Sequence, residues 1–171
     1  MKIKIIEVKT GIDAAAEIRE GTLNELPSMH DNWRFNFYKQ IKKLSNSTAY
    51  VLVTEEEPGV VQGCMIFQMV DKMIPNMAFI EIAPHNHKDV RKYDNVAGCL
   101  IAFAFQQSLK LGKGDYKGLL FLDVMEEHQE DQQKLIAVYT DKYNAQIVTR
   151  ETLLISDEGG RELIEHYLER K

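Results

Sequence analysis

The residues best suited to chemistry follow a strand-like segment in the middle of the chain. Residues 79–86 read FIEIAPHN, and residues 91–98 read RKYDNVAG before a long apolar run. This order is typical of a strand, a loop and the start of a helix, where free N–H groups and the helix dipole bind phosphate. Asn95 and Gly98 are residue types that tolerate unusual dihedral angles or a close backbone approach. We therefore expect an anion site at the start of this helix.

The spacing of this loop matches neither of two common phosphate-binding fingerprints, GxGxxG and GxxxxGK[ST]. At residues 92–97, KYDNVA, the chain resembles the GNAT superfamily of acyl-CoA-dependent N-acetyltransferases, whose pyrophosphate loop reads R/Q-x-x-G-x-G/A before a long helix. The copy is degenerate, because Lys92 stands for Arg or Gln and Asn95 stands for the first glycine. Asparagine is the non-glycine residue most at ease at positive φ, so the loop can keep its shape.

A second element of the superfamily, N-x-x-A-x-x-x-Y followed by Gly-Phe, is echoed near the end of the chain. Gln132, Leu135 and Tyr139 have the matching spacing, and residues 142–145, KYNA, stand where the Gly-Phe pair is usual. Neither half of that pair is kept. The order of elements resembles that of the superfamily from the first strand to about Thr149, which is most of the chain.

The resemblance implies acetyl-CoA as the co-substrate and places its binding site. The pyrophosphate is expected on the loop and helix start, and the backbone of Ile82 and Ala83 is expected to pair with the pantetheine arm in a gap between the fourth and fifth strands. Pro84 has no N–H group, so ladder pairing ends there. The expected cofactor-binding residues are Ile82, Ala83, Arg91, Lys92, Tyr93, Asp94, Asn95, Val96, Ala97 and Gly98.

Acetyl transfer to an amine needs a base that removes a proton and an acid that protonates the departing thiolate. Glu81 lies on the fourth expected strand, where many members of the superfamily place a carboxylate base, and alternation puts Ile80 and Ile82 on the opposite face. Tyr139 stands where the resemblance places the tyrosine that acts as the general acid of the superfamily. The alternatives are a solvent-facing strand glutamate and a packed helix tyrosine.

The acceptor side has weaker signals. Trp33 and Phe37 belong to an apolar stripe that is either core or part of an acceptor pocket, since the first two helices of the superfamily commonly wall that site. Asn86 either holds substrate at the mouth of the cleft or caps a turn. We expect Trp33 and Asn86 as substrate residues. His85 and His87 have no third ligand nearby in the sequence, so no metal is expected.

Hydrophobic periodicity indicates the elements that must position these residues. The expected strands are residues 2–8, 49–54, 60–70, 73–83, 117–124, 145–149 and 152–156. The expected helices are residues 13–26, 32–44, 96–111, 130–143 and 159–170. The helix over residues 96–111 is apolar nearly all round as far as Phe105, so it should be sandwiched against a sheet.

This order predicts an α/β (α+β) fold, a GNAT-like single mixed, mostly antiparallel sheet of about six to seven strands with helices on both faces. We expect one domain over residues 1–171, because 171 residues of ordinary composition are the length of one domain. The net charge of −5, from 21 Lys+Arg against 26 Asp+Glu, disfavours a nucleic-acid partner.

The sequence contains no signal-peptide pattern and no run of about 18 apolar residues. Cys64 and Cys99 lie in apolar surroundings, as buried reduced thiols do. We therefore expect a cytoplasmic protein with no membrane partner. Exposed strand edges or the last helix could build a homodimer, and nothing in the sequence decides this.

Together these patterns favour an N-acetyltransferase that moves an acetyl group from acetyl-CoA to a primary amine by direct attack in a ternary complex. The acceptor would be a small molecule or a peptide. The alternative is a GNAT-like domain with weak or no catalysis that acts as an acyl-CoA sensor or interaction module. The degenerate loop keeps both interpretations open.

Overall fold

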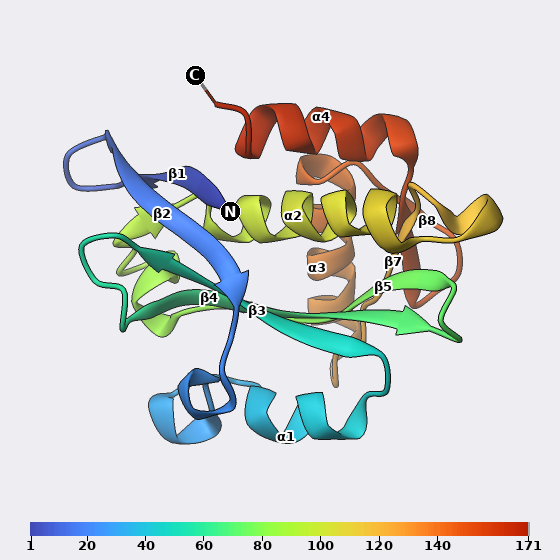
Figure 1. Cartoon of the computed structure of the whole chain (residues 1–171), viewed down its shortest axis with the longest axis horizontal. Coiled ribbons are helices and arrows are strands. Elements are labelled where there is room, and N and C mark those ends of the chain that lie inside the picture. The colour runs from blue at the N-terminus through green and yellow to red at the C-terminus, as the bar shows by residue number, and fades with distance from the viewer. Residues whose placement is uncertain (171) are drawn as a thin grey trace.

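The computed structural model describes residues 1–170 and contains one sheet with helices on both faces (Figure 1). The strands are β1 (Lys2–Glu7), β2 (Ile12–Glu20), β3 (Ser47–Thr54), β4 (Val61–Val70), β5 (Ile74–Ile82), β6 (Tyr93–Asp94), β7 (Leu120–Asp123), β8 (Ala145–Ile147) and β9 (Thr152–Ile155). They lie in the order β6-β1-β2-β3-β4-β5-β7-β9-β8. Only β5 and β7 pair in parallel among the described residues. The predicted mixed, mostly antiparallel sheet is confirmed.

Helices lie on each side of this sheet, as predicted. The α-helices are α1 (Phe37–Lys43), α2 (Val96–Leu111), α3 (Gln129–Lys142) and α4 (Asp157–Tyr167). The short 3₁₀ helices are η1 (Leu23–Glu25), η2 (Met29–Asp31), η3 (Pro84–Asn86) and η4 (Gly114–Tyr116). Figure 1 shows α1 under one face of the sheet, α2 along the other face, and α4 outermost over α2.

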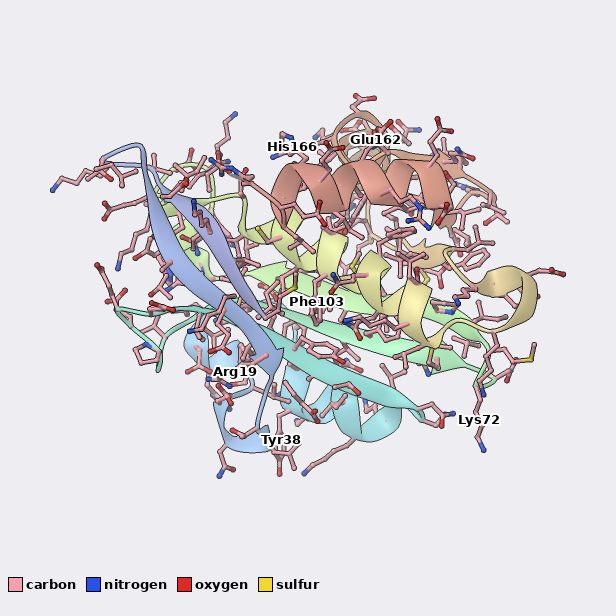
Figure 2. All side chains as sticks on the ribbon, turned by 45° about the horizontal axis from the view of Figure 1, so that its top comes forward. Arg19, Tyr38, Lys72, Phe103, Glu162 and His166 are labelled. Carbon is pink, nitrogen blue, oxygen red and sulfur yellow. The ribbon has the colours of Figure 1, made fainter. Side chains whose placement is uncertain are left out.

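The long helix α2 is buried on nearly all sides, which confirms the expected sandwich. It packs on β1, β4 and β5 with one side and on α4 with the other. Phe103 lies between α2 and the sheet and meets the ring of Tyr50 at a centroid distance of 4.9 Å (Figure 2). Glu162 and His166 are exposed on the outer side of α4. Helix α4 therefore shields the apolar outer side of α2 from water.

The expected helix over residues 13–26 is wrong, because most of this segment forms β2. Gly11, at φ +69°, closes a tight hairpin after β1. Ala16 and Ile18 then alternate with Glu17 and are fully buried, so the alanines pack as a strand. Pairing with β1 and β3 overrides the helix propensity of alanine, which is a weak preference on its own.

The second expected helix, over residues 32–44, is shorter in the structure. Asn32 has the left-handed conformation, φ 63°, and ends η2. Helix α1 begins only after Asn36, whose side chain accepts a hydrogen bond from the N–H of Lys39 at 2.9 Å. Trp33 and Phe37 still share one apolar cluster under the sheet, so the predicted stripe is confirmed although its first residue is not helical.

The other elements lie close to their predicted positions. The meander of β3, β4 and β5 and the helix α2 are as expected, and the sheet has nine strands because β2 and the short β6 add to the predicted set. Cys64 and Cys99 are buried free thiols. None of the helices described between residues 1 and 170 has the length and apolar character needed to cross a membrane.

Candidate active site

Strands β5 and β7 share a single register pair, Asn76 with Phe121. β5 continues to Ile82 while β7 ends at Asp123, so the edge of β5 beyond Asn76 has no strand beside it in the described part of the chain. On its other side β5 stays paired with β4 as far as Ile82. The sheet therefore opens beside the C-terminal half of β5, where Glu81 lies.

A bulge in β5 decides which side chains face each side of this opening. The register with β4 shifts at Ala78, which is the extra residue. Ala78 and Phe79 both pack in the cluster on the α1 face, whereas Ile80 and Ile82 pack on the α2 face. Bulges re-aim the residues that follow them, and the alternation after the bulge places Glu81 on the α1 face.

The carboxylate of Glu81 is held by two backbone N–H groups. Its Oε1 accepts from Arg34 N–H at 2.7 Å, and its Oε2 accepts from Phe35 N–H at 3.0 Å. Both donors belong to the segment that enters α1, so this carboxylate anchors that segment to the sheet. The two bonds use about half of the acceptor positions of a carboxylate, and the side chain is only half-buried. Glu81 therefore keeps free acceptor positions.

No sequence pattern pointed to the ion pair beside Glu81. The guanidinium of Arg34 donates two hydrogen bonds to the two oxygens of Glu126, each at 2.7 Å. Glu126 follows β7, so the pair joins the segment before α1 to the segment after β7 and closes the opening on the α1 face. Arg34 also lies over the ring of Phe35, 5.0 Å from its centroid. The only available signal was a pair of glutamates after a buried strand.

Tyr139 lies on α3 next to Glu126. Burial, and to a smaller extent the carboxylate of Glu126, raises the pKa of its hydroxyl to about 12. The ring packs on that of Tyr143 at a centroid distance of 5.9 Å. The hydroxyl makes no hydrogen bond to another of the described residues, and since it is not a buried unpaired atom, solvent reaches it. A phenol in this state is protonated at neutral pH and has a donor to spare.

The start of α2 has the geometry of an anion site. Asn95 takes the left-handed conformation, φ 67° and ψ 2°, which is the role expected for it in place of glycine. No side chain caps this helix, and its first internal bond runs from Cys99 N–H to Asn95 C=O at 2.9 Å. The N–H groups of the three preceding residues have no intrahelical acceptor. These residues are Val96, Ala97 and Gly98.

The remaining residues of the predicted cofactor loop divide into exposed cations and packed residues. Arg91 and Lys92 are exposed, and their partners are Asp94 at 3.4 Å and Glu57. Tyr93 and Val96 have buried side chains, and Gly98 is buried and has none, so only backbone groups of these three residues could meet a ligand. The carboxylate of Asp94 accepts from Asn95 N–H at 2.8 Å and places a negative charge beside the site.

The two residues expected to pair with a pantetheine arm differ in their free backbone groups. The N–H of Ala83 donates to Gln62 C=O at 2.9 Å, and its C=O accepts from Asn86 N–H at 2.8 Å. The N–H of Ala83 is therefore not available to a ligand strand, and its C=O already has one partner. Ile82 faces the open edge, where its C=O lies 3.3 Å from Nε2 of the exposed His87. A ligand strand could bind there once this ring moves.

The sequence matches no protein-family model and no curated protein, but solved structures resemble the fold. A variant of the spermidine N-acetyltransferase of Vibrio cholerae has a TM-score of 0.55 at 14% identity, covering 85% of this chain and 95% of that chain. A GNAT family acetyltransferase of Elizabethkingia anophelis with acetyl-CoA bound has a TM-score of 0.51 at 11% identity, covering 82% and 97%. An uncharacterised protein of Bacillus halodurans has a TM-score of 0.57 at 11% identity, covering 95% and 93%.

The chain has the GNAT fold. The resemblance expected from the loop around Asn95 is confirmed at the level of the fold, across more than four-fifths of the chain in each comparison. Identities of 11% and 14% do not carry over the role of any side chain.

Asn86 is buried in the loop that leads to α2. Its side chain is 1% exposed, donates to Gln62 Oε1 and C=O, and accepts from Tyr93 N–H at 2.9 Å. His85 Nε2 lies 2.6 Å from the same Gln62 oxygen. The amide of Asn86 thus makes three hydrogen bonds that fix the loop leading to α2, as the alternative role in a turn would require.

Trp33 is mainly a core residue. It is 7% exposed, and its ring meets that of Phe37 edge to face at a centroid distance of 6.0 Å. One side of the ring borders a hollow of about 540 Å³ near Val61 and His85. The hollow lies on the α1 face of the GNAT fold, but neither Glu81 nor Glu126 lines it.

A larger hollow of about 940 Å³ lies between the end of α3 and α4. It is lined by polar residues such as Asp141 and Glu162, and neither Glu81 nor Tyr139 lines it. The larger of the two hollows therefore does not coincide with the candidate catalytic residues. Among residues 1–170, no group of three or more His, Cys, Asp or Glu side chains is arranged to hold a metal ion.

Proposed function

We propose that the protein is an acyl-CoA-dependent N-acetyltransferase that transfers an acetyl group from acetyl-CoA to a primary amine by direct attack. The observation that carries this proposal is the parting of β5 from β7 after Asn76 beside an uncapped helix start at Asn95. The GNAT fold supports it, as does the acetyl-CoA bound to the structural neighbour from Elizabethkingia anophelis.

The residues at the opening fit acetyl-CoA. The unpaired N–H groups of Val96, Ala97 and Gly98 and the positive end of the α2 dipole suit a pyrophosphate. Arg91 and Lys92 add local positive charge although the chain as a whole is acidic. The free edge at Ile82 suits a chain that pairs as a strand would. Acetyl-CoA supplies the activated acyl group when bound.

The two proposed catalytic residues lie at opposite sides of the opening. Glu81 faces the α1 side, so the amine would enter from that side and give up its proton to Glu81, directly or through water. The amine nitrogen bonds to the acyl carbon as the carbon–sulfur bond breaks. Tyr139 then stabilises the departing sulfur.

The role of Tyr139 follows from its protonation state. A phenol with a pKa of about 12 remains protonated at neutral pH and can donate to the sulfur. Complete proton transfer to a thiolate with the ordinary pKa of cysteine, about 8.5, is uphill. We therefore assign hydrogen-bond donation as the larger part of its contribution.

A steady-state assay tests this proposal. The protein is incubated with acetyl-CoA and a panel of primary amines, and both free thiol and acetylated amine are measured. Equal amounts of the two products would support transfer. Thiol released without acetylated product indicates hydrolysis and contradicts it. Binding of acetyl-CoA without turnover on any amine supports the sensor or interaction module instead.

A further inference from the structure

The Arg34–Glu126 ion pair occupies the α1 side of the opening, where the proposed amine would enter. Arg34 lies among the carboxylates of Glu126, Glu81 and Glu127, which raise the pKa of its guanidinium, with the hydrogen-bonded Glu126 having the largest effect. The chain thus already holds one cation at this place.

Each contact of this guanidinium is one that an alkylammonium group can also make. Glu126 provides two oxygens for charge-assisted hydrogen bonds. The ring of Phe35 provides a face for a cation, and its edge-to-face contact with Phe79, at a centroid distance of 5.2 Å, fixes that ring. The place is therefore built for a cation in general.

The two partners of the ion pair differ in exposure. The side chain of Arg34 is 53% exposed, whereas that of Glu126 is 15% exposed. Arg34 can swing into water at little cost. Glu126 is the more enclosed of the two, although it is not fully buried. Departure of Arg34 would leave a partly enclosed carboxylate that attracts another positive charge.

Tyr139 provides a further polar group near Glu126. Its hydroxyl makes no hydrogen bond within residues 1–170 and is not a buried unpaired atom, so solvent or a ligand can reach it.

We propose that Arg34 is an internal competitor for a diamine acceptor, whose ammonium group displaces the guanidinium from Glu126 and binds between Glu126 and the ring of Phe35. The second amino group of the diamine would then lie toward Glu81, which removes its proton. This inference rests on the proposed function, because it names the acceptor class of that same site. Arg34 is a specificity-determining residue in this account.

Isothermal titration of 1,4-diaminobutane at low salt tests the displacement, with 1,4-butanediol as the uncharged analogue. The backbone N–H of Arg34 still bonds Glu81 in the variant Arg34→Gln, so only the competing charge is removed. This variant should bind the diamine about fivefold more tightly than the wild type, the upper end for an exposed ion pair. Adding Glu126→Gln should abolish the gain.

The matched control is Arg161→Gln, which breaks an exposed ion pair with Asp157 on α4, 2.9 Å long. It should leave diamine affinity unchanged. Equal or weaker diamine binding by Arg34→Gln overturns the inference, and so does equally strong binding of the diol. Acetyl-CoA is titrated into the same samples: its failure to bind would refute the proposed function and leave the diamine comparison standing.

Discussion

The ring of Tyr167 lies against Gly98, so closely that a Cβ built on Gly98 would overlap three of the ring carbons. The contact joins the end of α4 to the first turn of α2. The backbone C=O of Tyr167 also lies 3.5 Å from the Sγ of Cys99. Gly98 is therefore required by helix packing, independently of any ligand.

The variant Gly98→Ala should destabilise the protein by about 1–3 kcal/mol, because the added methyl group overpacks this contact. Chemical denaturation measures the free energy of unfolding. Gly59→Ala is the control, since nothing lies within 4 Å of a Cβ there, and it should change stability by less than about 0.5 kcal/mol. Equal stability of Gly98→Ala and wild type would contradict the packing. In the double variant Gly98→Ala, Tyr167→Ala, the smaller residue at position 167 should relieve the overlap with the added methyl group.

The left-handed conformation of Asn95 should matter for cofactor binding. Asn95→Gly should keep CoA affinity, whereas Asn95→Val should weaken it, because a β-branched residue is costly at positive φ, by about 1–2 kcal/mol. Asn46, at φ 51° before β3, offers a matched test. Asn46→Val should cost similar stability without changing CoA affinity. If both valine variants affected CoA binding equally, the loop would have no special role.

Removal of the Tyr139 hydroxyl should affect turnover more than folding. Tyr139→Phe keeps the packed ring, and the hydroxyl has no protein partner to lose. We expect turnover to fall by roughly 100-fold, the lower end for an acid–base group, with acetyl-CoA affinity retained. Tyr50→Phe, at a tyrosine on β3 whose pKa is also raised by burial, is the control with unchanged turnover. A Tyr139→Phe variant of normal activity would exclude the assigned role.

Acid should weaken the segment that leads from β2 to α1. Two hydrogen bonds from Arg19, at 2.7 and 2.9 Å, hold the pKa of Glu25 at about 2, below its ordinary 4.5 (Arg19 is labelled in Figure 2). A lowered folded-state pKa stabilises the protein above the unfolded pKa, and this stability is lost as pH falls from about 4.5 toward 2. Partial exposure limits the effect to at most about 2 kcal/mol.

Denaturation curves at several pH values measure this contribution. Glu25→Gln should lower stability at pH 7 and show a smaller further loss between pH 5 and 2 than the wild type. Arg19→Gln should behave in the same way, since it removes the main cause of the lowered pKa. Identical pH profiles for the wild type and both variants would refute the assignment.

The sequence was a good guide where the pattern is local and strong. The apolar run after Asn95 predicted α2 to the residue, and the alternating runs predicted the β3–β4–β5 meander. The alanine-rich segment around Ala15 was wrongly predicted as a helix, because the helix propensity of alanine stabilises less than pairing with β1 does. Tertiary contacts decided that segment, and no local pattern contains them.

The site was predictable only in part for the same reason. Alternation along one strand predicted that Glu81 faces away from Ile80 and Ile82, and the residue type of Asn95 predicted its left-handed conformation. Arg34 and Glu126 are 92 residues apart and meet only through the fold. For Asn86 the sequence left a substrate residue and a turn cap open, and its bonds to Gln62 and Tyr93, which fix the loop, depend on contacts that only the fold brings together.

The central claim is an acetyl-CoA site between the open edge of β5 and the start of α2. Thermal unfolding in the presence of acetyl-CoA, CoA or ATP tests it most directly. At 100 times the dissociation constant, a single site adds about 2.7 kcal/mol to the free energy of unfolding. The account predicts a clear rise in Tm with acetyl-CoA and with CoA, and little with ATP. An unchanged Tm with both CoA forms at millimolar concentration would contradict it.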